Sequence, residues 1–268
     1  MLFIFTQKQT TKIYDFIPYQ YGCFSYSVYA DINVLIQKNI IQENQNIVNL
    51  NDETDYYRQL KQEDRYFMQQ LKSQFSTMSN DDLIHYTYTN FPYWAIKSTI
   101  AKNRLTADEY AKVEKYIPKS DKTILFTIGY EGISLEEYLN RLIRNDVKVL
   151  VDVRRNPLSM KYGFSKNQLS RYCSNLSIEY VHFPEVGIES EQRQELNTQA
   201  DYNKLFEIYK KNNLPKTLAT QKRIFELLIQ KQRIALTCFE ANICMCHRKH
   251  LAESIAALPS FNYEIKHI

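Results

Sequence analysis

Side chains suited to catalysis are concentrated in the second half of this 268-residue sequence, close to short apolar runs. Five have the acid–base or nucleophilic groups that enzymes use: Glu131, Asp152, His182, Glu240 and Cys246. Six others suit the binding of an anionic substrate: Tyr130, Arg154, Ser159, Arg193, His247 and Arg248. Because the planar guanidinium group binds phosphate and carboxylate oxygens bidentately, the set predicts a site for a phosphorylated substrate.

The central element that must position these groups is a strand, turn, helix and strand over residues 122–155. Residues 124–128 form the near-continuous apolar run of a strand buried on both faces. Residues 129–132 then turn the chain, and Ser134 is placed to cap a helix whose leucines recur at positions 135, 139 and 142. A second buried strand over residues 147–153 completes the unit from which parallel sheets are built.

Further strands are predicted at residues 178–183, 233–239 and 262–268, with helices at 165–175, 202–211, 218–230 and from 246 to about 257. Strands that alternate with helices indicate an α/β domain, with a mostly parallel sheet covered by helices on both faces. Ligands of such sheets bind beyond the carboxyl ends of the strands. The polar groups named above follow those ends, so we expect them to meet at one edge.

The first half of the chain is predicted to be mainly helical and winged-helix-like. Ser25 is placed to cap a helix to residue 38, and helices are also expected at residues 55–75 and 81–88. Residues 43–55, rich in Asn, Asp and Glu, are expected to form a wing-like hairpin. Pro118 opposes helix continuation, so we predict an interaction domain over residues 1–118 and an α/β domain over residues 121–268.

Charge and composition restrict the partners. The formal net charge is +4, and residues 1–120 carry 13 basic and 13 acidic side chains, so the excess lies in the second half. This balance argues against phosphate binding by the first half and favours a protein partner there. No apolar run reaches the roughly 18 residues of a membrane span. The five cysteines form no secreted-type framework, so we expect a cytoplasmic protein with no membrane partner.

Several candidate residues have a structural interpretation as well as a functional one. Asp152 and Arg154 lie on the same side of their strand, where they form either a structural ion pair or an oriented substrate-binding arginine. Glu131 is either a tuned base or the cap of a turn, and His182 is either an acid–base group or a structural strand-end residue. Ser159 either binds substrate or hydrogen-bonds within its own loop.

The segment around Cys246 leaves similar alternatives. A helix N-terminus and Arg248 would favour the Cys246 thiolate. Neighbouring residues of a helix do not face each other, so His182 rather than His247 is the expected base. The alternative is a buried, inert Cys246 with Arg248 bound to Glu240.

Neither a metal nor a cofactor is expected from the spacing of the motifs. Cys238, Cys244, Cys246 and His247 are four donors within ten residues, but they lack the paired cysteines of usual zinc knuckles. Residues 129–132 have the wrong spacing for a nucleotide-binding glycine motif.

Two family resemblances accompany this pattern. Residues 123–260 resemble the domain-of-unknown-function 488 family (DUF488). The motifs that carry this resemblance are Ile128-Gly129-Tyr130-Glu131-Gly132, Val151-Asp152-Val153-Arg154, Pro157-Leu158-Ser159, Gly163-Phe164-Ser165, Tyr180 with His182 and Pro184, Gly187-Ile188 with Arg193, and Cys238-Phe239-Glu240 with Cys246-His247-Arg248. The sequence departs from the family at Val186-Gly187, where a Leu-Gly pair is expected. The resemblance implies where the site lies and assigns no activity.

The first half resembles the Panacea (SocA-like antitoxin) domain over about 90 residues. The residues that carry this resemblance are the segment 14–25, the helix that ends near Leu35, Asn39-Ile40-Ile41 and Asn90-Phe91-Pro92-Tyr93. It implies a mostly helical domain in a defence or toxin–antitoxin setting.

Together these features predict an intracellular α/β enzyme that acts on a phosphorylated substrate, a nucleotide or nucleic acid. The alternative is a non-catalytic regulatory protein that binds a ligand or partner. If the polar groups at the strand ends use all their hydrogen bonds and charges on one another, the structure favours this second hypothesis.

Overall fold

A computed structural model of the chain describes residues 1–44, 47–189, 192, 196 and 198–268. The chain divides into two compact units, Met1–Ile117 and Pro118–Ile268.

The second unit is built on a five-stranded sheet in which every neighbouring pair is parallel. Its strands are β5 (Ile124–Gly129), β6 (Val149–Asp152), β7 (Glu179–His182), β8 (Arg233–Cys238) and β9 (Glu264–His267). Their order in the sheet is β7-β6-β8-β5-β9, so β8 enters late in the chain between β6 and β5. The predicted parallel α/β class is confirmed.

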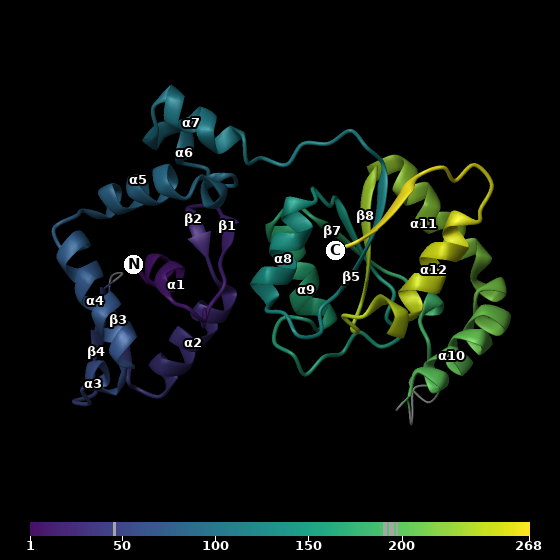
Figure 1. Ribbon diagram of the computed structural model, residues 1–268, viewed down its shortest axis with the longest axis horizontal. Helices are drawn as coiled ribbons and strands as arrows, with labels where there is room; N and C mark the ends of the chain where they lie inside the picture. Colours follow the sequence, from purple (N-terminus) through teal and green to yellow (C-terminus); the bar gives the residue numbers. More distant parts are fainter. Residues whose placement is uncertain (45–46, 190–191, 193–195, 197) are drawn as a thin grey trace. The chain divides into compact units, whose positions relative to one another are not determined.

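Helices cover both faces of this sheet (Figure 1). On one face lie α8 (Leu135–Arg144) and α9 (Lys166–Asn175). On the other lie α10 (Gln199–Ile208), α11 (Leu218–Lys231) and α12 (His247–Ala256). Short helical turns at Pro184–Val186, Tyr209–Asn213, Pro215–Thr217 and Ile243–Met245 complete the unit.

Helix α8 begins where the sequence predicted, after the capping residue Ser134. The Oγ of Ser134 accepts a hydrogen bond from the backbone N–H of Glu137, 3.0 Å away, as an N-cap should. Leu135, Leu139 and Leu142 are buried as the helical spacing predicts. Ser165 also lies at a helix N-cap, but its Oγ donates to the carbonyl of Ser159 and makes no capping bond.

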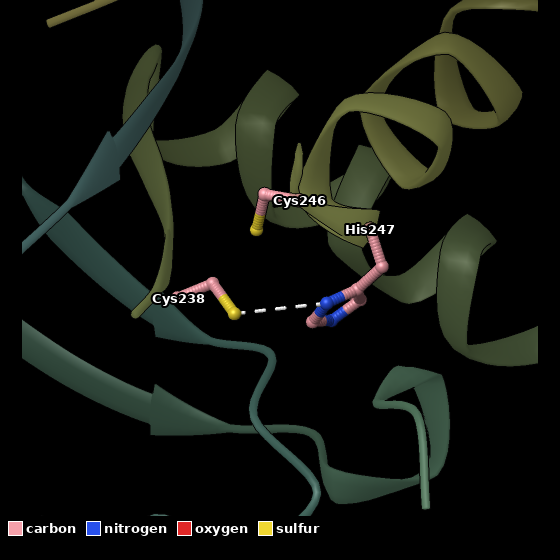
Figure 2. A group of neighbouring side chains, drawn as sticks. All are labelled: Cys238, Cys246 and His247. Carbon is pink, nitrogen blue, oxygen red and sulfur yellow. Dashed lines mark hydrogen bonds between the residues drawn. The ribbon is translucent and has the colours of Figure 1, made fainter. Parts of the chain in front are cut away.

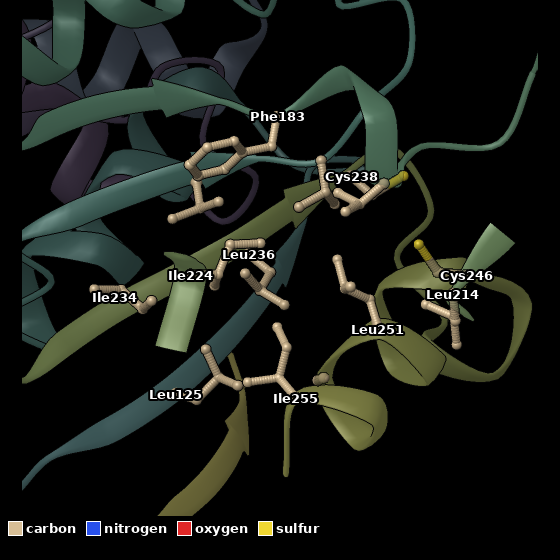
Figure 3. Packing of buried hydrophobic residues seen from close by; sticks show 14 of the residues in the cluster. Leu125, Phe183, Leu214, Ile224, Ile234, Leu236, Cys238, Cys246, Leu251 and Ile255 are labelled. Carbon is tan, nitrogen blue, oxygen red and sulfur yellow. The ribbon is translucent and has the colours of Figure 1, made fainter. Parts of the chain in front are cut away.

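A continuous apolar core fills the space between the sheet and helices α10–α12 (Figure 3). Strand residues Leu125, Ile234 and Leu236 pack there with the helical residues Ile224, Leu251 and Ile255, all fully buried. Each such side chain contributes about 1.5–3 kcal/mol by leaving water. This core fixes β8 against α12, the two elements that flank the cysteine cluster described below.

The first unit is mainly helical and contains two antiparallel hairpins. Its helices are α1 (Leu2–Lys8), α2 (Tyr26–Gln37), α3 (Tyr56–Gln59), α4 (Gln62–Phe75), α5 (Asn80–Asn90), α6 (Ala101–Arg104) and α7 (Ala107–Glu114), with a 3-10 turn at Pro92–Ala95. The hairpins pair β1 (Ile17–Tyr19) with β2 (Gly22–Phe24) and β3 (Ile41–Asn44) with β4 (Ile47–Leu50). The second hairpin lies slightly before the predicted residues 43–55.

Two local predictions in this unit have different outcomes. Ser25 caps α2, because its Oγ accepts from the N–H of Val28 at 3.2 Å. The predicted helix over residues 55–75 is divided into α3 and α4, since Leu60 and Lys61 have extended backbone between them. None of the helices in the described ranges combines the length and apolar character needed to cross a bilayer.

Candidate functional site

The carboxyl ends of four strands lie side by side in the second unit. Gly129 at the end of β5 is in register with Cys238 at the end of β8. Asp152 at the end of β6 is in register with His182 of β7 and Thr237 of β8. The register therefore brings segments that are more than 100 residues apart to one edge of the sheet.

Asp152 and Arg154 form a buried ion pair at this edge, with the two residues 0% and 5% exposed. The Nε of Arg154 donates to both carboxylate oxygens of Asp152, at 2.9 and 3.1 Å. The hydroxyl of Tyr180 donates to Oδ2 of Asp152 at 2.6 Å. The Nη1 of Arg154 donates to the hydroxyl of Tyr130 at 2.8 Å and to the carbonyl of Phe164 at 2.9 Å.

These contacts keep Arg154 charged and Tyr180 neutral. Burial opposes the charge of Arg154, but the hydrogen bonds and charge of Asp152 raise the arginine pKa overall. Burial and the same carboxylate raise the pKa of Tyr180. The hydrogen bonds use four of the five N–H donors of Arg154. The geometry thus favours the structural interpretation of the pair, with at most one donor left for a ligand.

A cavity of about 280 Å³ opens beside this ion pair. The residues that line it include the aromatic residues Tyr130 and Phe239, Arg154 and Arg155, and the loop around Ser159. Arg155 is exposed and pairs with Glu189, with 2.7 Å between Nη2 and Oε1. Of these residues Phe239 and Arg155 are exposed, whereas Tyr130 and Arg154 are buried.

Two segments that border the cavity, the loop after β6 and the residue after β8, expose apolar side chains. Leu158 is 75% exposed, Phe239 is 42% exposed and Met160 is fully exposed, and all three line the cavity. The Oγ of Ser159 accepts from the backbone N–H of Lys161 at 3.1 Å, the local hydrogen bond of its structural interpretation. Exposed apolar groups around a cavity are typical of a binding surface.

Glu131 and Lys161 lie near the same wall. The Oε2 of Glu131 accepts from the backbone N–H of Ala241 at 2.9 Å, so this carboxylate fixes the loop after β8. The Nζ of Lys161 donates to the carbonyl of Tyr130 at 2.7 Å. Burial lowers the pKa of Lys161, although nearby Glu131 opposes the shift. The sequence prediction missed Lys161; its position two residues after Ser159 in the predicted loop was the available signal.

His182 is fixed by two contacts of its ring. Its Nε2 lies 2.9 Å from the carbonyl of Arg154, and its Nδ1 lies 3.1 Å from the Nζ of Lys166. A carbonyl can only accept, so Nε2 carries the proton and Nδ1 accepts from the lysine. Both nitrogens are used in this way, and neither contact directs His182 to Cys246 as the sequence analysis expected.

Cys238, Cys246 and His247 form a compact group instead (Figure 2). All three are fully buried, and their potential ligand atoms lie within 4.8 Å of one another. Cys246 has extended backbone before the first turn of α12, so the helical spacing that separates adjacent residues does not apply to it and His247. Burial raises the pKa of the Cys246 thiol, opposite to the stabilised thiolate expected at a helix N-terminus.

Arg248 binds Glu240, but it does so through the backbone of Glu240. Arg248 is 2% exposed, and its Nη1 donates to the backbone carbonyl of Glu240 at 2.5 Å rather than to the carboxylate. Its Nη2 donates to the carbonyl of Ala241 at 3.3 Å. Arg248 therefore holds the loop after β8 in place. Cys244 is exposed, and Arg193 lies outside the described residues.

The second unit is thus an α/β domain with its polar cluster and its cavity at the carboxyl ends of parallel strands. Residues 134–255 match the family model described as domain of unknown function DUF488. The second unit belongs to that family, as its motifs predicted. No curated protein matches the chain, and no solved structure does. The resemblance of the first unit to the Panacea domain stays a prediction.

Proposed function

We propose that the DUF488 unit binds a phosphorylated ligand of the nucleotide class in the cavity beside Arg154. The observation that carries this proposal is that one cavity is lined by aromatic residues and arginines, of which Phe239 and Arg155 are exposed. A planar base stacks on rings such as Phe239, and a phosphate binds to arginine side chains. The exposed Leu158 and Met160 add apolar surface that a ligand would cover.

A binding role is favoured over acid–base catalysis by Asp152. This carboxylate is fully buried and is bound by Arg154 and Tyr180. A base must instead reach the proton that it removes. In this proposal Arg155 supplies the main phosphate contact by exchanging its exposed partner Glu189 for the ligand, since such surface pairs are weak.

Calorimetric titration of the full chain with nucleosides, nucleotides, inorganic phosphate and a short oligonucleotide tests the proposal. We expect a nucleotide to bind more tightly than its nucleoside or phosphate, and Arg155→Ala and Phe239→Ala each to weaken it at least tenfold. Arg141→Ala is the matched control, because Arg141 is similarly exposed and pairs with Glu137 on α8. The proposal fails if the whole panel shows no binding or if the three variants behave alike.

An enzyme that acts on such a ligand is the second candidate. Lys161 favours it, because an amine with a lowered pKa is a better base or nucleophile at neutral pH. Product formation from the bound nucleotide, lost in Lys161→Gln while binding persists, would support this candidate. Binding without turnover in the wild-type chain would leave the regulatory role.

For the first unit, we propose a protein partner in a defence or toxin–antitoxin setting. The balanced charge of residues 1–120 supports a protein over a nucleic acid there. Co-purification of a partner with residues 1–117, together with unchanged mobility of DNA in a gel shift, is the expected result.

A further inference from the structure

Three side chains of the kinds that bind transition metals converge where β8 ends and α12 begins (Figure 2). Cys238 is the last residue of β8, Cys246 immediately precedes α12, and His247 is its first residue. Both sulfur atoms and the imidazole point into the same small space. The three residues are fully buried, so the protein core fixes their positions.

The distance between the donor atoms of Cys238 and His247 fits a tetrahedral ion. A zinc ion with bonds of about 2.3 Å to sulfur and about 2.0–2.1 Å to nitrogen holds these atoms about 3.5–3.6 Å apart. The Sγ of Cys238 and the Nδ1 of His247 are 3.6 Å apart. Little movement of these two side chains is needed to accept the ion.

The imidazole of His247 is oriented as a metal ligand is. Its Nε2 lies 3.1 Å from the carbonyl oxygen of Val153. This oxygen can only accept, so Nε2 carries the proton and the lone pair of Nδ1 faces the cysteines. Metal-binding histidines almost always donate their other N–H to a backbone carbonyl or carboxylate in this way.

From this geometry we propose that Cys238, Cys246 and His247 bind one zinc ion. Two thiolates and an imidazole are donors that zinc prefers, and both thiols release their protons when it binds. The carboxylate of Glu240 accepts a hydrogen bond from the Sγ of Cys238 at 3.2 Å, so it lies beside one of the three ligands. The ion joins the end of β8 to the start of α12 and, through Val153, to the end of β6.

The spacing of the cysteines in the sequence predicts no metal site, and the proposed site differs from that prediction. Zinc knuckles take paired cysteines from one tight turn, whereas Cys238 at a strand end and Cys246 at a helix start are eight positions apart in the sequence. The short turn Ile243–Met245 leads the chain back so that Cys246 approaches Cys238. Cys244, within that segment, is exposed and takes no part.

The test is the zinc content of the full chain, purified under reducing conditions without a metal-affinity column and measured by mass spectrometry of the elements. We expect one zinc per chain in the wild-type protein and at least tenfold less in Cys238→Ser and His247→Gln. Cys244→Ser is the matched control and should keep the full content. Cobalt titration uses only the wild-type chain, so its result does not depend on whether a variant folds. It should produce sulfur-to-cobalt charge-transfer absorption that saturates at one equivalent of cobalt.

The competing explanation is a buried thiol–imidazole hydrogen bond with no metal. A wild-type chain that neither contains zinc nor develops the cobalt absorption establishes that explanation and overturns the proposal. Loss of metal in Cys244→Ser, or a disulfide between Cys238 and Cys246 in the protein as purified, would overturn it too. None of these measurements depends on nucleotide binding, so they test the zinc site independently of the proposed function.

Discussion

At the scale of single residues, Asp152 shows how a group suited to catalysis can serve structure. Its carboxylate accepts from Arg154 and from Tyr180 and has no exposed surface. Removing one partner of a buried ion pair leaves the other charge unpaired. We expect Asp152→Asn to lower the free energy of unfolding by about 3–5 kcal/mol, measured by urea denaturation.

The matched control for this prediction is a surface pair of the same kind. Glu137 and Arg141 are 3.0 Å apart on α8, and both side chains are about a third exposed. Glu137→Gln should therefore cost no more than about 0.5 kcal/mol. Equal losses in the two variants would mean that the charge of Arg154 is hydrated in the folded protein.

The second residue-scale prediction concerns His250 and pH. Its ring packs against Phe206, and burial lowers its pKa; the bond to Glu253 opposes the shift, while Lys210 and Lys249 add to it. The unfolded chain therefore takes up a proton at a higher pH than the folded protein does. Stability should fall as the pH is lowered through about 6.5, the ordinary histidine value, and level off below the folded pKa.

Urea midpoints of the wild-type chain and His250→Asn between about pH 7.5 and 5 measure this effect. We expect the variant to lose less stability across the range, because it has no proton to take up at this position. Since the pKa of His267 is also lowered by burial, part of the slope should persist. A slope unchanged by the substitution would assign the pH dependence to other groups.

At the scale of elements, the sequence predicted strands and caps well because both have local signals. Strands β5, β6 and β8 are buried on both faces and are therefore continuous apolar runs. Ser25 and Ser134 cap their helices from predictable positions. The break between α3 and α4 was missed, since it depends on the backbone of Leu60 and Lys61 and interrupts no apolar pattern.

The candidate site was harder to predict than the elements around it. The Asp152–Arg154 pair is local, so strand alternation was enough to place both side chains on one side. Whether the pair can still bind a ligand depends on its other hydrogen-bond partners. These are Tyr130, Phe164 and Tyr180, which belong to other segments of the chain. The approach of Cys246 to Cys238 likewise depends on the path of the loop between β8 and α12.

Gly129 provides a prediction for that loop. A Cβ at this position would lie 1.9 Å from the carbonyl oxygen of Glu240, so the loop that Arg248 holds in place would have to move. We expect Gly129→Ala to cost about 3 kcal/mol of unfolding free energy, the cost of overpacking. Thermal and urea denaturation of the purified variants measure it.

Gly132, in the turn that follows β5, is the matched control. A Cβ there meets nothing within 4 Å, but the residue has a φ of +74°. Gly132→Ala should therefore cost only the backbone strain, about 1–2 kcal/mol. If Gly129→Ala were the milder substitution, the loop after β8 would have to be freer than its hydrogen bonds to Arg248 and Glu131 indicate.

At the scale of the whole molecule, each unit has its own buried core. Phe3, Phe16, Leu71 and Phe75 are buried together in the first unit, and the sheet of the second is complete between residues 124 and 267. Between α7 and β5 the chain is exposed at Lys119 and Lys122. Separate cores joined by an exposed segment predict that the units fold independently.

Limited trypsin digestion tests that independence and should cut first after Lys119. Lys122 is equally exposed, but Nη1 of Arg233 binds its carbonyl at 2.9 Å and the Oγ of Ser120 at 3.1 Å, which holds residues 120–122 against the second unit. Proteases need a locally unfolded segment. Lys119 precedes the residues that Arg233 holds, so the chain should be cut faster after Lys119 than after Lys122. Mass spectrometry should identify a fragment that begins at Ser120, and Lys119→Gln, which removes this trypsin site, should abolish that fragment and slow the separation of the two units several-fold. Both fragments should keep their helical circular dichroism and unfold in separate transitions, whereas early cuts within helices or strands, or the collapse of either fragment after cleavage, would show that the units need each other.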